Sequence, residues 1–131
     1  MGMPNFKSGI KSKGIPVLGG EGLFTKGDSF FLDPVNGNDG YNGKTPDKAF
    51  KTLAVAYAAL TDGAGDVLYY LAGATSLTGL SATLTWAKSY THFVGICAPT
   101  IVAQRARIFQ LSTATGISPL INITGSGCIF K

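Results

Sequence analysis

The sequence predicts a mainly β protein, and three observations support this fold class. Glycine accounts for 18 of the 131 residues and is spread along the chain, as suits short strands joined by tight turns. Short apolar runs in the second half are separated by Gly, Ser, Thr, Asn and Pro, which is typical of strands and their turns. Only one stretch carries clear helix signals. A β-sandwich and a solenoid of stacked short strands both fit these observations.

Residues 1–28 are predicted to form an extended arm. Their apolar residues follow neither helical nor strand periodicity, so the segment cannot bury them by itself. No aromatic residues are interleaved with its lysines, so nucleic acid is not a favoured partner. We expect the arm to become ordered on another protein, with a flexible leader as the alternative. The predicted anchoring residues are Phe6, Lys7, Ile10, Lys11, Lys13, Ile15, Val17 and Leu18.

Residues 29–65 are predicted to hold a strand, a loop and the single helix. The strand is the run SFFLD, and the helix begins with Thr45 as N-cap, Pro46 at the first helical position and Asp47 in the first turn. Asp62-Gly63 is predicted to end it. The expected apolar face consists of Phe50, Leu53, Ala54, Tyr57 and Leu60.

Residues 66–131 are predicted to be strands. The runs are DVLYYLAG, ATLTWA, THFVGICAP, ARIFQLS, PLINITG and GCIFK. Several of them are continuously apolar, which favours strands that are buried on more than one side or packed against a neighbouring chain. Charged residues make up only 14% of the chain, so we expect other protein to cover much of its surface.

The loop between the first strand and the helix is rich in Asn, Asp and Gly. One interpretation is a calcium site formed by Asp33, Asn36, Asn38 and Asp39, because calcium prefers oxygen ligands. The spacing does not match an EF-hand, however. We favour a turn in which the polar side chains cap their own backbone. In this interpretation Gly37, Gly40 and Gly43 supply positive φ angles.

Other candidate sites are each better explained by structure. His92 stands alone at the start of an apolar strand, without a second metal ligand or a nucleophile motif. Asp62 and Asp66 resemble an acid pair for glycoside chemistry, but helix-end and turn roles explain them better. Trp86 and Tyr90 are candidates for stacking on sugar rings, although aromatic residues in a strand-rich domain more often form core or subunit contacts.

The glycines and cysteines add no chemistry. The segment LGGEG lacks the frame of a phosphate-binding loop. Cys97 and Cys128 lie in apolar runs and are expected to be core thiols, with a disulfide between them as the alternative. We therefore predict no catalytic residues, no metal and no cofactor. No secretory signal or membrane-spanning run is present in the sequence.

Residues 30–60, FFLDPVNGNDGYNGKTPDKAFKTLAVAYAAL, resemble the opening of many right-handed parallel β-helix proteins of the pectin-lyase-like class. The segments YTHFVGICAPTIV and SPLINITGSGCIFK are similar to rungs of that class. The resemblance implies a strand, turn and capping helix (29–65) and the first β-helix rungs (66–131), while the arm (1–28) matches no motif of the class. Because the chain stops after an apolar strand without a polar cap, we expect these rungs to continue in a longer product.

In that class such an opening is common in bacteriophage virion proteins. The resemblance therefore implies a structural virion protein of the capsid decoration or head-fibre type, attached to the major capsid protein or another virion protein through its arm. It also implies a homotrimer located in the virion. The residues themselves predict synthesis in the host cytoplasm and no nucleic-acid or membrane partners. The alternative is a tailspike or tail-fibre protein that binds or degrades host surface polysaccharide. A bacterial surface carbohydrate-binding module is a third hypothesis.

Overall fold

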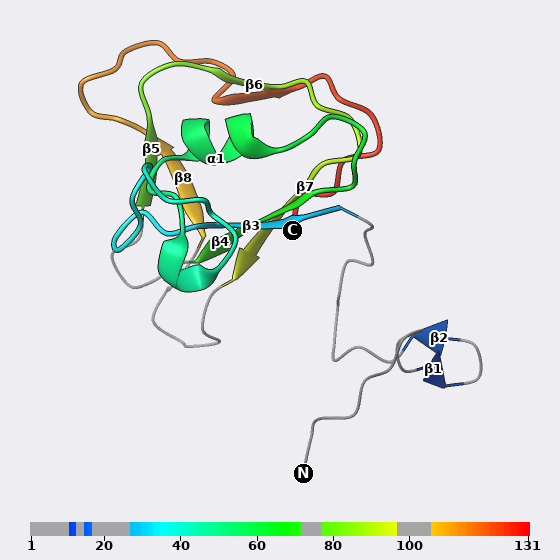
Figure 1. Ribbon diagram of the computed structural model, residues 1–131. Coiled ribbons are helices and arrows are strands. Elements are labelled where there is room, and N and C mark those ends of the chain that lie inside the picture. Colours follow the sequence, from blue (N-terminus) through cyan, green and yellow to red (C-terminus); the bar gives the residue numbers. More distant parts are fainter. Residues whose placement is uncertain (1–10, 13–14, 17–26, 72–76, 97–105) are drawn as a thin grey trace.

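A computed structural model describes residues 11–12, 15–16, 27–71, 77–96 and 106–131 (Figure 1). The described part is mainly β, with one short α-helix. Its strands are β1 (Lys11–Ser12), β2 (Ile15–Pro16), β3 (Ser29–Leu32), β4 (Val67–Leu71), β5 (Leu77–Leu80), β6 (Leu84–Trp86), β7 (His92–Ile96), β8 (Arg107–Gln110) and β9 (Ile121–Ile123). Its helices are the 3-10 helix η1 (Pro46–Lys48) and the α-helix α1 (Leu53–Ala59).

Seven of the strands form three parallel sheets. The orders are β3-β4-β7, β5-β8 and β6-β9. The chain thus passes through the three sheets once as β4, β5 and β6, which we call a circuit, and a second time as β7, β8 and β9. Each strand of the second circuit pairs with the corresponding strand of the first. It then returns to β7, where Phe93 and Phe130 form an isolated parallel bridge. The remaining strands, β1 and β2, pair antiparallel with each other.

The core lies between the sheets and α1. In the view of Figure 1 the three sheets surround α1, which buries Leu53 and Ala56. Tyr57 on α1 packs against Trp86 on β6 in a tilted arrangement, with ring centroids 4.8 Å apart. Trp86 and Tyr70 are fully buried. Burial of aromatic and aliphatic side chains is therefore what holds the helix against the sheets.

The predicted helix is wrong at its start. Thr45, Pro46 and Asp47 begin η1, not α1, and the Thr45 side chain makes no cap hydrogen bond. Phe50 is extended because it forms a parallel bridge with Leu32 in β3. Its N–H donates to the Phe31 carbonyl (2.9 Å), and its own carbonyl accepts from the Asp33 N–H (2.8 Å). These bonds interrupt any helix through residue 50.

The α-helix begins about two turns later than predicted, at Leu53 instead of Pro46. Thr52 is its N-cap, and the Thr52 hydroxyl accepts a hydrogen bond from the Val55 N–H at 3.5 Å. Of the expected apolar face, Ala54 is exposed, and Ala56 is buried instead, because it lies three residues after Leu53 and four before Leu60, on their side of the helix. The helix ends at Ala59, before the predicted Asp62-Gly63.

Most predicted strands are confirmed, and three strands of the structure, β1, β2 and β5, were not predicted. The run SFFLD is β3, and the runs of residues 66–131 contain β4, β6, β7, β8 and β9, while GCIFK contributes the bridge at Phe130. The prediction missed β5, whose sequence LTGL is short and contains a central glycine. It also missed β1 and β2, in the segment that was expected to lack strand structure.

The last circuit leaves apolar residues exposed. Ile123 on β9 is 51% exposed, and Ile129 and Phe130 are also exposed. Within the described residues β8 pairs only with β5, and β9 only with β6. Of the two expectations for these continuous apolar runs, the single chain does not bury Ile129 and Phe130 on more than one side, and packing against a neighbouring chain stays a prediction.

Candidate functional site

The Asn/Asp/Gly loop is a series of side-chain-capped turns. The Asp33 carboxylate accepts hydrogen bonds from the backbone N–H groups of Val35 (2.9 Å) and Asn36 (3.0 Å). Asn38 Oδ1 accepts from the N–H of Gly40 at 2.8 Å in the same manner. These are the contacts that the turn interpretation predicts. In the part of the chain that the structure describes, no group of three or more His, Cys, Asp or Glu side chains is placed to hold a metal ion.

The loop glycines serve two different purposes. Gly43 adopts a positive φ of 67°, as predicted. Gly37 and Gly40 do not have positive φ angles, so the prediction is wrong for them. Gly37 is required by close packing instead, because a side chain there would collide with the carbonyl oxygens of Asp33 and Phe50. The loop thus lies tightly on the extended segment at residue 50.

Asp39 connects the loop to the start of α1. Its Oδ1 accepts hydrogen bonds from the N–H groups of Lys51 (2.8 Å) and Thr52 (2.9 Å). Burial acts to raise the pKa of the Asp39 carboxyl, but the hydrogen bonds from Thr52 and Lys51 and the Lys51 charge together hold this pKa below its usual value. Asp39 therefore acts as a backbone acceptor in its ionised form.

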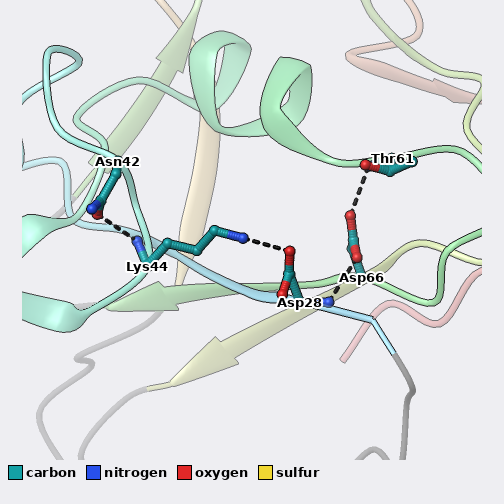
Figure 2. Close-up of polar contacts among 5 residues, drawn as sticks. All are labelled: Asp28, Asn42, Lys44, Thr61 and Asp66. Carbon is teal, nitrogen blue, oxygen red and sulfur yellow. Dashed lines mark hydrogen bonds and ion pairs between the residues drawn. The ribbon is translucent and has the colours of Figure 1, made fainter.

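A second polar cluster joins Asp28, directly before β3, to the segment that follows the C-terminal end of α1 (Figure 2). Asp66 is only 3% exposed, and both of its carboxylate oxygens accept backbone hydrogen bonds, from Asp28 (2.8 Å) and Thr61 (2.7 Å). The Lys44 ammonium forms an ion pair with the Asp28 carboxylate at 2.6 Å and lies over the Phe30 ring. This junction fixes the position at which the N-terminal segment meets β3.

Asp62 and Lys88 hold the same, C-terminal end of the helix. Asp62 Oδ1 accepts from the Ser89 N–H at 2.6 Å. The Lys88 ammonium donates to the carbonyl oxygens of Tyr57 (2.9 Å), Ala58 (2.9 Å) and Leu60 (2.6 Å). Asp62 and Asp66 are therefore both engaged by backbone donors, and the structure assigns them the helix-end and turn roles that the sequence favoured over an acid pair.

The aromatic and histidine candidates separate into core and surface. Trp86 is fully buried, and its Nε1 donates to the Thr91 hydroxyl at 2.8 Å. His92 is buried, and its Nδ1 accepts from the Ile129 N–H at 3.2 Å. Tyr90 is 57% exposed and has a positive φ of 52°. Trp86 and His92 thus have structural roles, while Tyr90 is available at the surface.

Several predicted residues lie partly or wholly outside the described part of the chain. Among the arm residues, Lys11 and Ile15 belong to β1 and β2. The remaining arm residues, the LGGEG segment and Cys97 lie outside the described residues. Cys128 is half-buried as a free thiol, and its Sγ donates to the Lys88 carbonyl.

Sequence reasoning missed two features. The Lys88 clamp on α1 has no local signal, because its carbonyl partners lie about thirty residues earlier in the chain. An open groove was also missed, because it is created only when the segment before α1 meets β5. Among its lining residues are Pro34, Lys51, Thr52, Gly79 and Thr83.

The helices in the described part of the chain are too short or too polar to cross a membrane. Comparison with known proteins identifies no similar protein. No protein-family model matches the chain, and no curated protein or solved structure matches it significantly.

Proposed function

We propose that the chain is a structural protein of a bacteriophage virion, attached to the capsid through residues 1–28. The observation that carries the proposal is the place where this segment joins the sheets. It enters at β3, an outer strand of its sheet, where the junction of Asp28 and Asp66 fixes it beside the end of α1. An anchor at that end leaves the stacked strands free to project from a particle.

We also propose that the sheets are the first rungs of a right-handed parallel β-helix. The repeated circuit of β4, β5 and β6 by β7, β8 and β9, with parallel pairing in every sheet, supports this architecture. Right-handed connections are strongly preferred between parallel strands. Exposed apolar residues such as Ile96 and Ile123 support contacts between subunits of a homotrimer.

The attachment depends on burial rather than on catalysis. Each arm side chain that becomes buried in a groove contributes about 1.5–3 kcal/mol. Several such anchors, multiplied by the arms of a trimer, give an avidity well above that of one arm. The carboxylates and amides of the loop support a structural role because they bind backbone N–H groups of the same chain.

The test compares the tagged full chain with a variant that lacks residues 1–25. Both are supplied during growth of a phage that carries the gene, and immunoblots of purified particles measure occupancy. We expect the full chain in the particles and the variant in the supernatant, with the folding of both checked by circular dichroism. A folded variant at full-length occupancy would refute attachment through the arm. Release of reducing sugar from host capsule by the chain would support the depolymerase alternative instead.

A further inference from the structure

An open groove of about 530 Å³ lies beside the start of α1. Residues 51–54 line one part of it, and residues 78–84, from β5 and the turn that leads to β6, line another. Leu53 and Leu80 are buried beneath it, and Leu84 is half-buried. The groove therefore has an apolar floor and follows a strand.

The strand along the groove has a free edge. β5 pairs with β8, and the Leu111 N–H donates to the Leu80 carbonyl at 2.9 Å, so the backbone groups of Leu80 point toward β8. Backbone groups of successive residues in a strand point to opposite sides. The N–H and C=O of Gly79 must then point away from β8, and they have no backbone partner among the described residues.

At the same end of the stack, the chain covers the outer edge of β3, and near β6 the described contacts begin only after that strand ends. The edge of β3 is occupied because the Phe31 N–H donates to the Gly43 carbonyl (2.8 Å) and the Phe31 carbonyl accepts from Phe50 (2.9 Å). Just after β6, the N–H groups of Ala87 and Lys88 donate to the Tyr57 hydroxyl. At this end β5 is left without a neighbour, although open edges are usually protected.

The described residues that line the groove carry one positive charge and no negative charge. Among the described residues that line it, Lys51 is the only charged one. Its side chain is exposed and forms no ion pair in the part of the chain that the structure describes, although its charge also acts on the Asp39 carboxyl. An occupant with a carboxylate near Lys51 would complement this charge.

We propose that the groove binds an extended, acidic segment of a partner protein, which adds to β5 as a further strand. The Gly79 N–H and C=O supply main-chain hydrogen bonds, the leucines contact alternate side chains of the segment, and Lys51 pairs with its carboxylate. The named residues of this docking site lie outside residues 1–28, and the proposal does not depend on attachment of those residues to a particle.

The experiment titrates the full chain, labelled with ¹⁵N, with the synthetic peptide acetyl-TVEVTV-amide up to millimolar concentration. We expect saturable shifts of the Gly79 and Lys51 amide signals. A matched peptide with Lys in place of Glu should bind about fivefold more weakly, the effect of one exposed ion pair. The variant Lys51→Glu should reverse this preference. A peptide N-methylated at alternate residues should not bind, because it cannot pair with a strand edge.

Three results would overturn the proposal. The first is the absence of shifts at Gly79, and the second is equal binding of the N-methylated peptide or of the lysine peptide. The third comes from hydrogen exchange of the full chain alone. If the Gly79 amide is as protected as that of Leu80, the chain itself already fills the groove, and no external segment is needed.

Discussion

At the scale of single residues, the buried polar side-chain atoms of the described residues have hydrogen-bond partners, with Thr78 as the exception. Its hydroxyl is buried and finds no hydrogen-bond partner within the described part of the chain. Thr91 provides a contrast, since its buried hydroxyl accepts from Trp86 Nε1 and donates to the Lys88 carbonyl, both at 2.8 Å. The same residue type is thus expected to have opposite effects on stability at the two positions.

We expect Thr78→Val to raise the free energy of unfolding by about 1 kcal/mol, because it removes an unpaired buried hydroxyl without changing the side-chain shape. Thr91→Val should lower it by about 2 kcal/mol, because it leaves the Trp86 N–H unpaired. Urea denaturation of both variants measures the two effects. A loss of stability in Thr78→Val would show that this hydroxyl has a partner after all.

Asp39 makes a prediction about acid stability. Its pKa is lower in the folded protein than its ordinary value of 3.8, so its ionised form stabilises the fold. This contribution is present above that ordinary value and is lost as the pH falls through the lowered pKa of the folded state. We expect Asp39→Asn to be less stable than the parent chain at neutral pH and to lose less stability on acidification. Parallel acid dependences for the two proteins would contradict this.

At the scale of elements, local signals predict strands better than they predict the helix. Thr45, Pro46 and Asp47 are a genuine helix start, but they yield only the short η1. The bridge of Phe50 to Leu32 overrides the helix propensity of the intervening residues, because it pairs the backbone and buries the Phe50 side chain. That preference for β3 depends on a contact distant in sequence, so the local pattern could not reveal it.

In the candidate site, the capped turns were predictable from the sequence, but the groove was not. The Asn/Asp side chains cap turns two or three residues away, and this local chemistry was read correctly from spacing. The free edge of β5 was not predictable, since a Gly-containing run such as LTGL gives little strand signal. Its groove arises only from the meeting of residues 51–54 with residues 78–84.

The Lys88 clamp makes a prediction about α1. Lys88→Met should lower the free energy of unfolding by about 2–3 kcal/mol, because three carbonyl oxygens at the helix end lose a charged donor. Lys88→Arg keeps the charge and should recover part of the loss. Thermal unfolding followed by circular dichroism compares the variants. Equal stability of Lys88→Met and the parent chain would show that water replaces the ammonium without cost.

At the scale of the whole molecule, the two ends of the stack differ. All seven carboxylate side chains lie between residues 21 and 66, and Lys88, Arg105, Arg107 and Lys131 are the charged side chains that follow. At the end with α1 the chain covers the outer edge of β3 but leaves that of β5 open, while the last circuit has unpaired edges at β8 and β9 in the described structure. Unpaired edges with exposed apolar residues promote association.

We expect the chain to self-associate through the last circuit. Ile123→Lys places a charge on β9, where the parent side chain is 51% exposed, and should reduce association without unfolding the protein. Sedimentation velocity over a range of concentrations measures the effect. As a matched control, Val55→Lys alters an exposed apolar residue on α1 and should leave association unchanged. An equal reduction by both variants would point to general charge repulsion.

The parallel pairing of β3 with β4 has a mechanical consequence. Tension transmitted from an anchored leader would reach the sheets at Asp28, directly before β3. A pull along β3 would load its four register pairs with β4 together, in shear, instead of opening them one at a time. Asp66, bonded to the Asp28 N–H, would share that load, so the tether should yield elsewhere before the first strand is torn away.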